Sequence, residues 1–397
     1  MPKLHNNLAI AGLTVLKSVL NEQKRASRIL SQTIVCHPKW GARDRKLLYT
    51  LVYDVLRWKR YYAFLLQDSN NNNTVDALLA CWCKLNEYTS EILNEVKFIT
   101  PPNPDSAPPA ITASFPDWLF TLGAAELGSI WEKEYRALNE QAAVSLRVNR
   151  LKSSPKKVQS QLVQQFQIKS EWDPAYPDAL LLSQGRKWDT NPLFKKGIFE
   201  IQDIHSQQIA PFTKVQPNDQ VIDLCAGAGG KTLHLAALMR NQGLIKAFDI
   251  EANKLKELNK RAKRAGAKII QVKCITSEND ILGLKNWANV VLIDAPCSGL
   301  GTLKRNPEIK WRLTHEQLSK LVSIQKNLLQ QAAGWVKPNG VITYATCSIL
   351  PSENRLQVQS FLNTHPEFKL ESDVTYYAHQ SAFDGFYMAR LRKKVEM

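Results

Sequence analysis

The chain has 397 residues, 44% of them hydrophobic and 22% charged, which indicates a soluble globular protein of two or three domains rather than one core. A membrane protein is excluded, because no apolar run approaches the roughly 20 residues that a spanning helix needs. With 52 basic and 36 acidic residues, the net charge of +16 favours an anionic partner, with nucleic acid first and an anionic membrane second.

The first part of the chain is predicted to be helical. From residue 8 to about 67, and again up to about 97, apolar residues recur at spacings of three and four. Arg57, Lys59 and Arg60 give the second of these helices a basic face at its far end. A cysteine pair follows, Cys81 and Cys83, without the second Cys/His pair that a zinc site would require, so we expect two buried helix residues.

A proline-rich segment ends this helical part. Residues 100–109 contain five prolines, too many for helix or sheet, and mark a linker with a domain boundary near residue 105. Connecting helices and a small α/β unit are expected next, and strand-like runs then alternate with helices. That alternation predicts a doubly wound, mostly parallel sheet of the Rossmann-like type. The expected domains are residues 1–105, 106–205 and 206–397.

The expected strands of this sheet are short apolar runs. They cover residues 221–224, 244–248, 269–272, 290–293 and 341–344.

A glycine cluster follows the first of these strands and leads into a helix. It consists of Cys225, Ala226, Gly227, Ala228, Gly229, Gly230 and Lys231. In open α/β sheets the ligand binds beyond the carboxyl end of the first strand, where glycines let the backbone approach it. Asp249 ends the second strand, where an acid can accept hydrogen bonds from both hydroxyls of a ribose. Nucleoside binding is the interpretation we prefer.

Three alternatives compete with a nucleoside site. A phosphate-binding P-loop would need a glycine where Cys225 stands, and a dinucleotide motif would need its third glycine where Thr232 stands. A glycine turn without a ligand is the third.

Two cysteines follow buried strands in matched positions. Cys297 comes after Asp294-Ala-Pro, and Cys347 comes after Tyr-Ala-Thr. Both loops should open on the edge of the sheet where the cofactor binds, because parallel strands all end on that side. Carbon 5 of cytosine is too poor a nucleophile to accept a methyl group directly, and a thiolate added to carbon 6 turns the ring into an enamine that can. The alternative for either cysteine is a buried structural residue.

That chemistry also needs an acid near ring nitrogen 3 and a base that removes the carbon 5 proton.

The motifs resemble a known family when they are taken together. They are Asp294 to Thr302, Tyr344 to Ser348, Cys225 to Thr232, and Asp384-Gly-Phe-Tyr387. This combination resembles the RsmB/Nop/Sun family of RNA 5-methylcytosine methyltransferases, with the bacterial RsmB branch closest. The start of the chain, with Ala42-Arg-Asp-Arg45 and Leu51 to Arg57, resembles the NusB-type helical RNA-binding domain of that branch.

The resemblance implies S-adenosylmethionine as cofactor and 16S ribosomal RNA of the small subunit as substrate. It makes Cys347 the nucleophile, assigns product release and the role of the proton-accepting base to Cys297, and gives Asp294 contacts with the cytosine and the cofactor. The loop from Cys225 to Lys231 would lie along the methionine part of the cofactor, and Asp249 would hold its ribose.

Two positions depart from the family pattern. The family loop usually reads Cys-Ala-Ala-Pro-Gly-Gly-Lys, whereas this chain has Gly227 and Ala228 in place of Ala-Pro. An acid usually follows the third strand near the adenine, whereas this chain has Lys-Cys-Ile at residues 273–275 and Asp280 only later.

Basic residues follow the Asp294 motif. Lys304, Arg305 and Arg312 are predicted to bind RNA phosphates beside Lys310 and Trp311. The alternative is a solvated basic loop with a core tryptophan.

At the end of the chain, the basic tail from Arg390 to Lys394 is expected to be a solvated terminus.

The expected protein is thus a monomeric, cytoplasmic RNA-modifying enzyme that uses neither a membrane nor a metal, since no secretory signal and no metal-ligand spacing are visible. A non-enzymatic NusB-like RNA-binding or assembly factor is one alternative. A methyltransferase that acts on tRNA, DNA, protein or a small molecule is the other.

Overall fold

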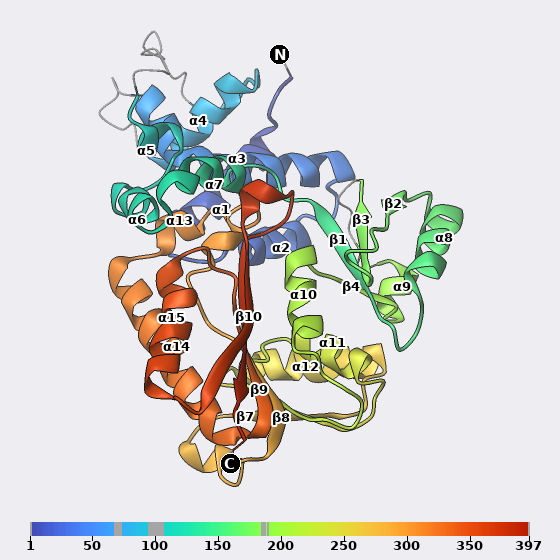
Figure 1. The fold of residues 1–397 in the computed structure, drawn as a ribbon. Helices are drawn as coiled ribbons and strands as arrows, with labels where there is room; N and C mark the ends of the chain where they lie inside the picture. The colour runs from blue at the N-terminus through green and yellow to red at the C-terminus, as the bar shows by residue number, and fades with distance from the viewer. Residues whose placement is uncertain (1, 67–73, 94–106, 184–187, 189, 396–397) are drawn as a thin grey trace. The chain divides into compact units, whose positions relative to one another are not determined.

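The computed structural model describes residues 2–66, 74–93, 107–183, 188 and 190–395, and it forms two compact units (Figure 1). The helical unit comprises Met1–Glu140 and Thr302–Thr314, and the sheet unit comprises Gln141–Gly301 and His315–Met397. The expected three-way division stays a prediction. Residues 94–106, which include much of the proline-rich segment, lie outside the described residues.

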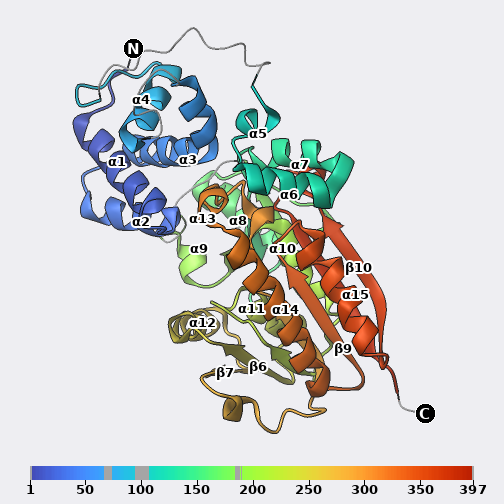
Figure 2. The ribbon, with the colours of Figure 1, turned by 90° about the vertical axis from the view of Figure 1, so that its left-hand side faces the viewer.

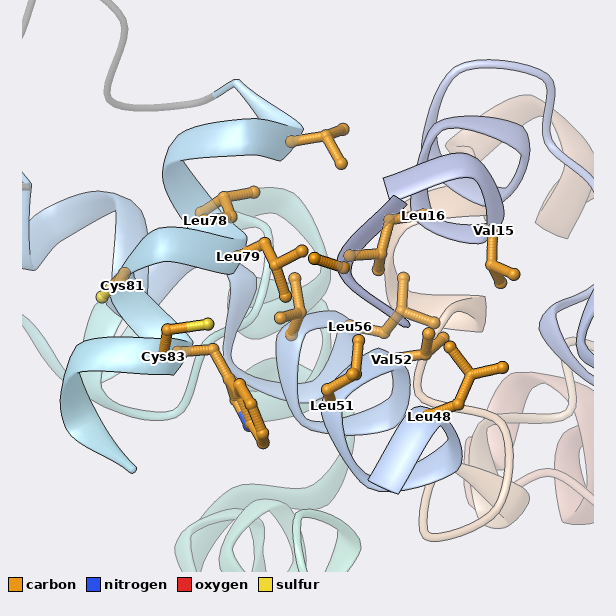
Figure 3. Packing of buried hydrophobic residues seen from close by; sticks show 14 of the residues in the cluster. Val15, Leu16, Leu48, Leu51, Val52, Leu56, Leu78, Leu79, Cys81 and Cys83 are labelled. Atoms are coloured by element: carbon orange, nitrogen blue, oxygen red, sulfur yellow. The ribbon is translucent and has the colours of Figure 1, made fainter. Parts of the chain in front are cut away.

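Four helices form the first core of the helical unit. They are α1 (Asn6–Leu20), α2 (Ala26–Cys36), α3 (Ala42–Leu65) and α4 (Val75–Leu85). The apolar stripes of α1, α3 and α4 meet through Leu16, Leu51 and Leu79, as Figure 3 shows. The predicted amphipathic helices are confirmed, and Cys81 and Cys83 are buried on α4 as expected. The likeness to a NusB-type domain stays a prediction.

The inserted segment, residues 302–314, completes the helical unit. Its short helix α13 (Ile309–Arg312) belongs to the same unit as α5 (Pro109–Thr112), α6 (Asp117–Leu127) and α7 (Trp131–Leu138).

The contacts of the inserted segment are polar and buried. The Lys310 ammonium is 1% exposed and donates to the Arg57 carbonyl (2.8 Å) and to Asn139 Oδ1 (3.0 Å). Trp311 Nε1 donates to the Leu56 carbonyl (2.6 Å), and Arg57 donates to the Lys304 carbonyl (2.9 Å). The segment is therefore an integral part of the helical unit.

The expected basic face at the far end of α3 is wrong. Arg57 is buried, and Arg60 donates to the Phe115 carbonyl and to Asp117. Lys59 lies 4.9 Å from the centre of the Trp311 ring, and burial lowers its pKa. Sequence spacing had placed these side chains in solvent because their partners lie far along the chain.

A small antiparallel sheet opens the sheet unit. Its strands are β1 (Val144–Val148), β2 (Ser170–Glu171), β3 (Ala179–Leu182) and β4 (Phe199–Ile201), in the order β2-β3-β1-β4. The helices α8 (Pro155–Phe166) and α9 (Pro192–Lys195) share its core, where Leu146, Val158 and Phe199 are buried. This confirms the expected small α/β unit.

A larger sheet carries the rest of the sheet unit. Its strands are β5 (Gln220–Asp223), β6 (Leu244–Asp249), β7 (Ile270–Cys274), β8 (Ala288–Asp294), β9 (Val336–Thr346), β10 (Phe368–Tyr376) and β11 (Phe386–Lys393). In the described residues their order is β10-β11-β9-β8-β5-β6-β7, and the five strands from β5 to β9 are parallel. All five predicted strands are confirmed.

Helices cover both faces of this sheet. They are α10 (Ile204–Phe212), α11 (Gly230–Leu238), α12 (Ala252–Ala265), α14 (His315–Trp335) and α15 (Arg355–Thr364). Successive residues of β5 point to opposite faces of the sheet. Ile222 packs in one core with α14 and α15, and Val221 packs in the other core with α10 and α11. Figure 2 shows α14 and α15 side by side on one face. The fold is the predicted doubly wound Rossmann-like sheet.

The last two strands differ from the expectation. β11 pairs antiparallel with both β9 and β10, so it lies inside the sheet. Arg390, which we expected in a solvated tail, is 6% exposed and forms an ion pair with Glu371 on β10. The alternation of basic and apolar residues in β11 is that of a strand with paired charges, not of a terminus.

Candidate active site

The glycine loop lies at the point where the strand order reverses. β6 and β7 extend the sheet on one side of β5, and β8 lies on the other side, so the loops after β5 and β8 flank the position where such sheets bind ligands. Gly227 has φ +54°, and a Cβ added there would meet no atom within 4 Å. A Cβ at Gly229 would lie 2.6 Å from Leu258 on α12. One glycine thus keeps the space before the loop open, and the other allows close packing behind it.

Asp249 is fixed against this loop. Its Oδ2 accepts a hydrogen bond from the Gly227 amide (2.8 Å), and its Oδ1 accepts one from the Glu251 amide (2.8 Å). Each carboxylate oxygen has a further lone pair that can accept a ribose hydroxyl. The residues present therefore fit a nucleoside cofactor, whose ribose Asp249 would hold.

Arginines support the loop from behind. Arg261 on α12 donates to the Ala228 carbonyl (2.7 Å) and to Glu200 on β4 (2.9 Å). Arg264, one helical turn later, donates to the other oxygen of Glu200 (2.5 Å). Arg147 on β1 donates to the Gly230 carbonyl. The small sheet thus helps to hold the loop, which sequence spacing could not reveal.

Lys231 connects the glycine loop with the loop after β8. Its ammonium lies 2.6 Å from Asp294 Oδ2, and both side chains are largely buried. Burial lowers the pKa of Lys231, but Asp294, with smaller contributions from Cys347 and Asp223, outweighs burial, so the pKa is raised. A charged Lys231 therefore interacts with both Asp294 and Cys347.

The two candidate thiols lie side by side. Cys297 Sγ is 3.4 Å from Cys347 Sγ. The hydrogen bond with Cys347, together with burial, raises the pKa of Cys297 well above its ordinary value. Either sulfur of the pair can donate this hydrogen bond to the other. Cys225, whose pKa burial also raises, belongs to the glycine loop and not to this pair.

The sequence-predicted residues therefore converge only in part. Asp249, Asp294 and Cys347 gather around the loop from Cys225 to Lys231, together with Cys297. Asp280 does not join them, since it accepts hydrogen bonds from Thr276 and Ser277 within its own loop.

The prediction that Lys304 binds RNA phosphates is wrong. Lys304 is 2% exposed, so its ammonium is not presented to a phosphate. Lys310 and Trp311, grouped with it in the sequence, are hydrogen-bonded inside the helical unit, and burial lowers the pKa of Lys310 well below its ordinary value. Arg305 and Arg312 are partly exposed, and their role in RNA binding stays a prediction.

Two further residues of the site were missed by sequence reasoning. Glu353 contacts both cysteine loops, and Arg261 holds the glycine loop. Local sequence did not reveal either role, because Glu353 binds Ser298 and Arg261 binds Ala228, each far away in the sequence.

Two properties of the described residues bear on other site types. None of their helices combines the length and hydrophobicity of a membrane span. Among the described residues, no group of three or more His, Cys, Asp or Glu side chains could hold a metal ion.

Solved structures share this architecture. The crystal structure of PH0851 has a TM-score of 0.83 and 25% sequence identity, and covers 99% of this chain and 100% of that chain. A methyltransferase homolog protein from Pyrococcus horikoshii has a TM-score of 0.63 and 25% identity, and covers 72% of this chain and 97% of its own. NSun6 from the same organism, with SFG, has a TM-score of 0.64 and 21% identity over 72% of this chain and 100% of its own, which indicates a shared fold. The parallel sheet and these neighbours place the chain in the class of S-adenosylmethionine-dependent methyltransferases.

Sequence comparisons narrow the class. Residues 211–392 match the family described as 16S rRNA methyltransferase RsmB/F, and residues 115–189 match the ferredoxin-like domain of RsmF/B-like methyltransferases. The probable ribosomal RNA small subunit methyltransferase B of Synechocystis is 33% identical over 303 residues, or 70% of this chain and 67% of that protein. The Pasteurella multocida ribosomal RNA small subunit methyltransferase B is 32% identical over 296 residues, or 70% and 65%. The chain belongs to the RsmB/F methyltransferase family, and the expected resemblance is confirmed.

Proposed function

We propose that this protein methylates carbon 5 of a cytosine in small-subunit ribosomal RNA through a covalent bond between Cys347 and carbon 6 of the base. The paired thiols of Cys297 and Cys347, 3.4 Å apart, are the observation that carries the proposal. The names of the two relatives above support the substrate class. The matches span about two thirds of those proteins, so substrate and reaction are both part of the proposal.

The proposed reaction begins with Cys347. Its thiolate adds to carbon 6 and forms a C–S bond, and the electron pair of the 5,6 double bond makes carbon 5 nucleophilic. S-adenosylmethionine, held by the glycine loop and Asp249, supplies the methyl group when bound. Loss of the carbon 5 proton to a base then restores the double bond, and the C–S bond breaks to return the Cys347 thiolate.

The environment of Cys297 supports the division of roles between the thiols. The contact with Cys347 and burial raise its pKa, and its sulfur lies 3.4 Å from the sulfur that attacks and later leaves. We assign Cys297 to product release for this reason.

The Lys231 and Asp294 pair supports recognition of the base. An acid beside ring nitrogen 3 stabilises the covalent adduct, and Asp294 ends β8, three residues before Cys297. Its ion pair with Lys231 fixes the carboxylate at the end of the strand, next to the glycine loop. We assign Asp294 to the base contact and Lys231 to the support of that contact.

The test is to incubate the protein with radiolabelled S-adenosylmethionine and unmodified small-subunit ribosomal RNA, digest the RNA, and identify the labelled nucleoside. We expect labelled 5-methylcytidine, and none with C347A. Label that appears in transfer RNA alone would replace the substrate. Cofactor binding without label in any RNA would favour a non-enzymatic RNA-binding factor.

A further inference from the structure

The two cysteine loops are built alike. Ser298 follows Cys297 and Ser348 follows Cys347, and each serine hydroxyl accepts the amide of the leucine two residues later: Leu300 for Ser298 (3.4 Å) and Leu350 for Ser348 (3.1 Å). Such turns fix the backbone directly after each thiol.

One carboxylate joins the two turns. Glu353 Oε2 accepts hydrogen bonds from the hydroxyls of both Ser298 (2.5 Å) and Ser348 (2.5 Å). Its Oε1 accepts one from the Ser298 amide (2.8 Å) and one from Gln325 Nε2 (3.0 Å). The Glu353 side chain is fully buried, so these four donors replace the water that a carboxylate requires.

The surrounding residues fix Glu353 in turn. Gln325 on α14 also donates to the Pro296 carbonyl (2.9 Å), directly before Cys297. The Tyr344 hydroxyl donates to the Glu353 carbonyl (2.6 Å), which ties the glutamate backbone to β9. The carboxylate therefore has one available position, and the two turns are set relative to it.

We propose that Glu353 is a positioning residue that sets the separation of the Cys297 and Cys347 thiols. This inference rests on the proposed function for its catalytic consequence, but not for the geometry. Without the carboxylate, the loops after β8 and β9 lose their shared acceptor, and the buried hydroxyls of Ser298 and Ser348 keep only their mutual contact at 3.3 Å and the leucine amides.

The decisive variant is Glu353→Gln, which keeps the size of the side chain but replaces one accepting oxygen with a donor. We expect diamide to form the Cys297–Cys347 disulfide about 10- to 100-fold more slowly than in the unaltered protein, measured by peptide mass spectrometry. In the methylation assay we expect kcat to fall by a similar factor, while KM for the cofactor stays within about twofold.

The matched control is Val358→Ala. Val358 lies on α15, five residues after Glu353, and is buried in the apolar core. This variant should lower the melting temperature without changing the disulfide rate or kcat, because it leaves the carboxylate contacts in place. If E353Q does not fold, S298A and S348A, each of which removes one hydroxyl donor, replace it, and both should slow disulfide formation.

Two outcomes separate this inference from the proposed function. If the rate of disulfide formation and kcat are the same in E353Q as in V358A, the role of Glu353 is overturned, whatever base the enzyme modifies. A slower disulfide in E353Q, with no 5-methylcytidine made by the unaltered protein, would keep the positioning role and reject the reaction.

Discussion

Cys297 and Cys347 are 50 positions apart in the sequence, yet their sulfur atoms share a hydrogen bond at 3.4 Å. The register of two neighbouring parallel strands brings them together, because Asp294 at the end of β8 pairs with Ala345 near the end of β9. Cys297 then follows the end of β8 by three residues, and Cys347 follows the end of β9 by one. The pair is therefore a product of sheet register, and its two members can be tested separately.

Replacement of the two cysteines should block different steps of the reaction. We expect C347A to abolish methyl transfer, because no other group would add to carbon 6. C297A should still form the covalent bond but release product slowly, so a protein–RNA adduct that survives denaturing electrophoresis should accumulate. Full transfer by C347A would move the nucleophile to Cys297.

Arg261 and Arg264 offer a matched pair for the glycine loop. Both bind Glu200, but only Arg261 is hydrogen-bonded to the Ala228 carbonyl. We expect R261A to raise the Kd for S-adenosylmethionine about 3- to 10-fold, because the loop loses a charge-assisted hydrogen bond. R264A should change it less. Calorimetric titration measures both, and equal effects would show that the link to Ala228 is irrelevant.

Asp223 makes folding stability depend on pH. Burial raises its pKa to about 7, with Asp294 and Asp249 adding to the rise, while Thr232 donates to it and opposes the rise. Between about pH 4 and pH 7 the folded protein binds one proton more at this site than the unfolded chain does. The free energy of unfolding should therefore decrease across this window as pH rises, and level off above it.

The test of this pH dependence is D223N, which cannot titrate and should flatten the decrease in urea unfolding measured from pH 5 to pH 8. His234 supplies an internal control, since burial lowers its pKa to about 4 and its contribution has the opposite sign. H234Q should make the decrease steeper. An unchanged slope in D223N would rule out Asp223 as its source.

Exposed basic residues on α2 and at the start of α3 are candidates for RNA contact. Between residues 25 and 46 the chain has six basic residues and one acid, Asp44, which accepts the Gly41 amide at the start of α3. Arg28, Arg43 and Lys46 are exposed. Their simultaneous replacement by glutamate should weaken RNA binding and reduce the dependence of log Kd on log salt by about one for each phosphate that the protein no longer neutralises.

A control for this surface lies elsewhere in the helical unit. Lys133 on α7 is exposed beside Glu132, so K133E changes the net charge without touching the basic surface. Fluorescence anisotropy at several salt concentrations compares the variants. A loss of binding free energy in K133E that is about one third of the loss in the triple variant, in proportion to the charge changed, would attribute RNA binding to net charge alone.

Much of the sheet unit follows from local sequence signals. The parallel strands are short apolar runs bounded by turns, and the rule that their carboxyl ends share one edge is enough to bring Asp249, Asp294 and Cys347 together. Glu353 carries no such signal, since an acid between Ser352 and Asn354 is recognisable as a buried partner only once Ser298, 55 positions earlier, is in place. β11 was missed because its charges are paired across strands and not along the chain.

The inserted segment is the clearest failure of local reasoning. A basic loop beside a tryptophan is typical of an RNA-binding surface, and nothing near residue 304 indicates otherwise. Lys310 instead bonds to Arg57, 253 positions earlier. Burial of a lysine depends on carbonyl groups of a distant helix, and hydrophobic periodicity does not report such acceptors.

Because the inserted segment belongs to the helical unit, that unit is discontinuous in the chain. During synthesis α1 to α4 leave the ribosome early and can build their own core, but Leu56, Arg57 and Asn139 wait for their partners until residues 302–314 have been made. By then β5 to β8 have also emerged. The last contacts of the helical unit therefore form only after the glycine loop and the first cysteine loop have been synthesised. The helical unit, although it begins the chain, is completed only when most of the residues proposed for methyl transfer are present.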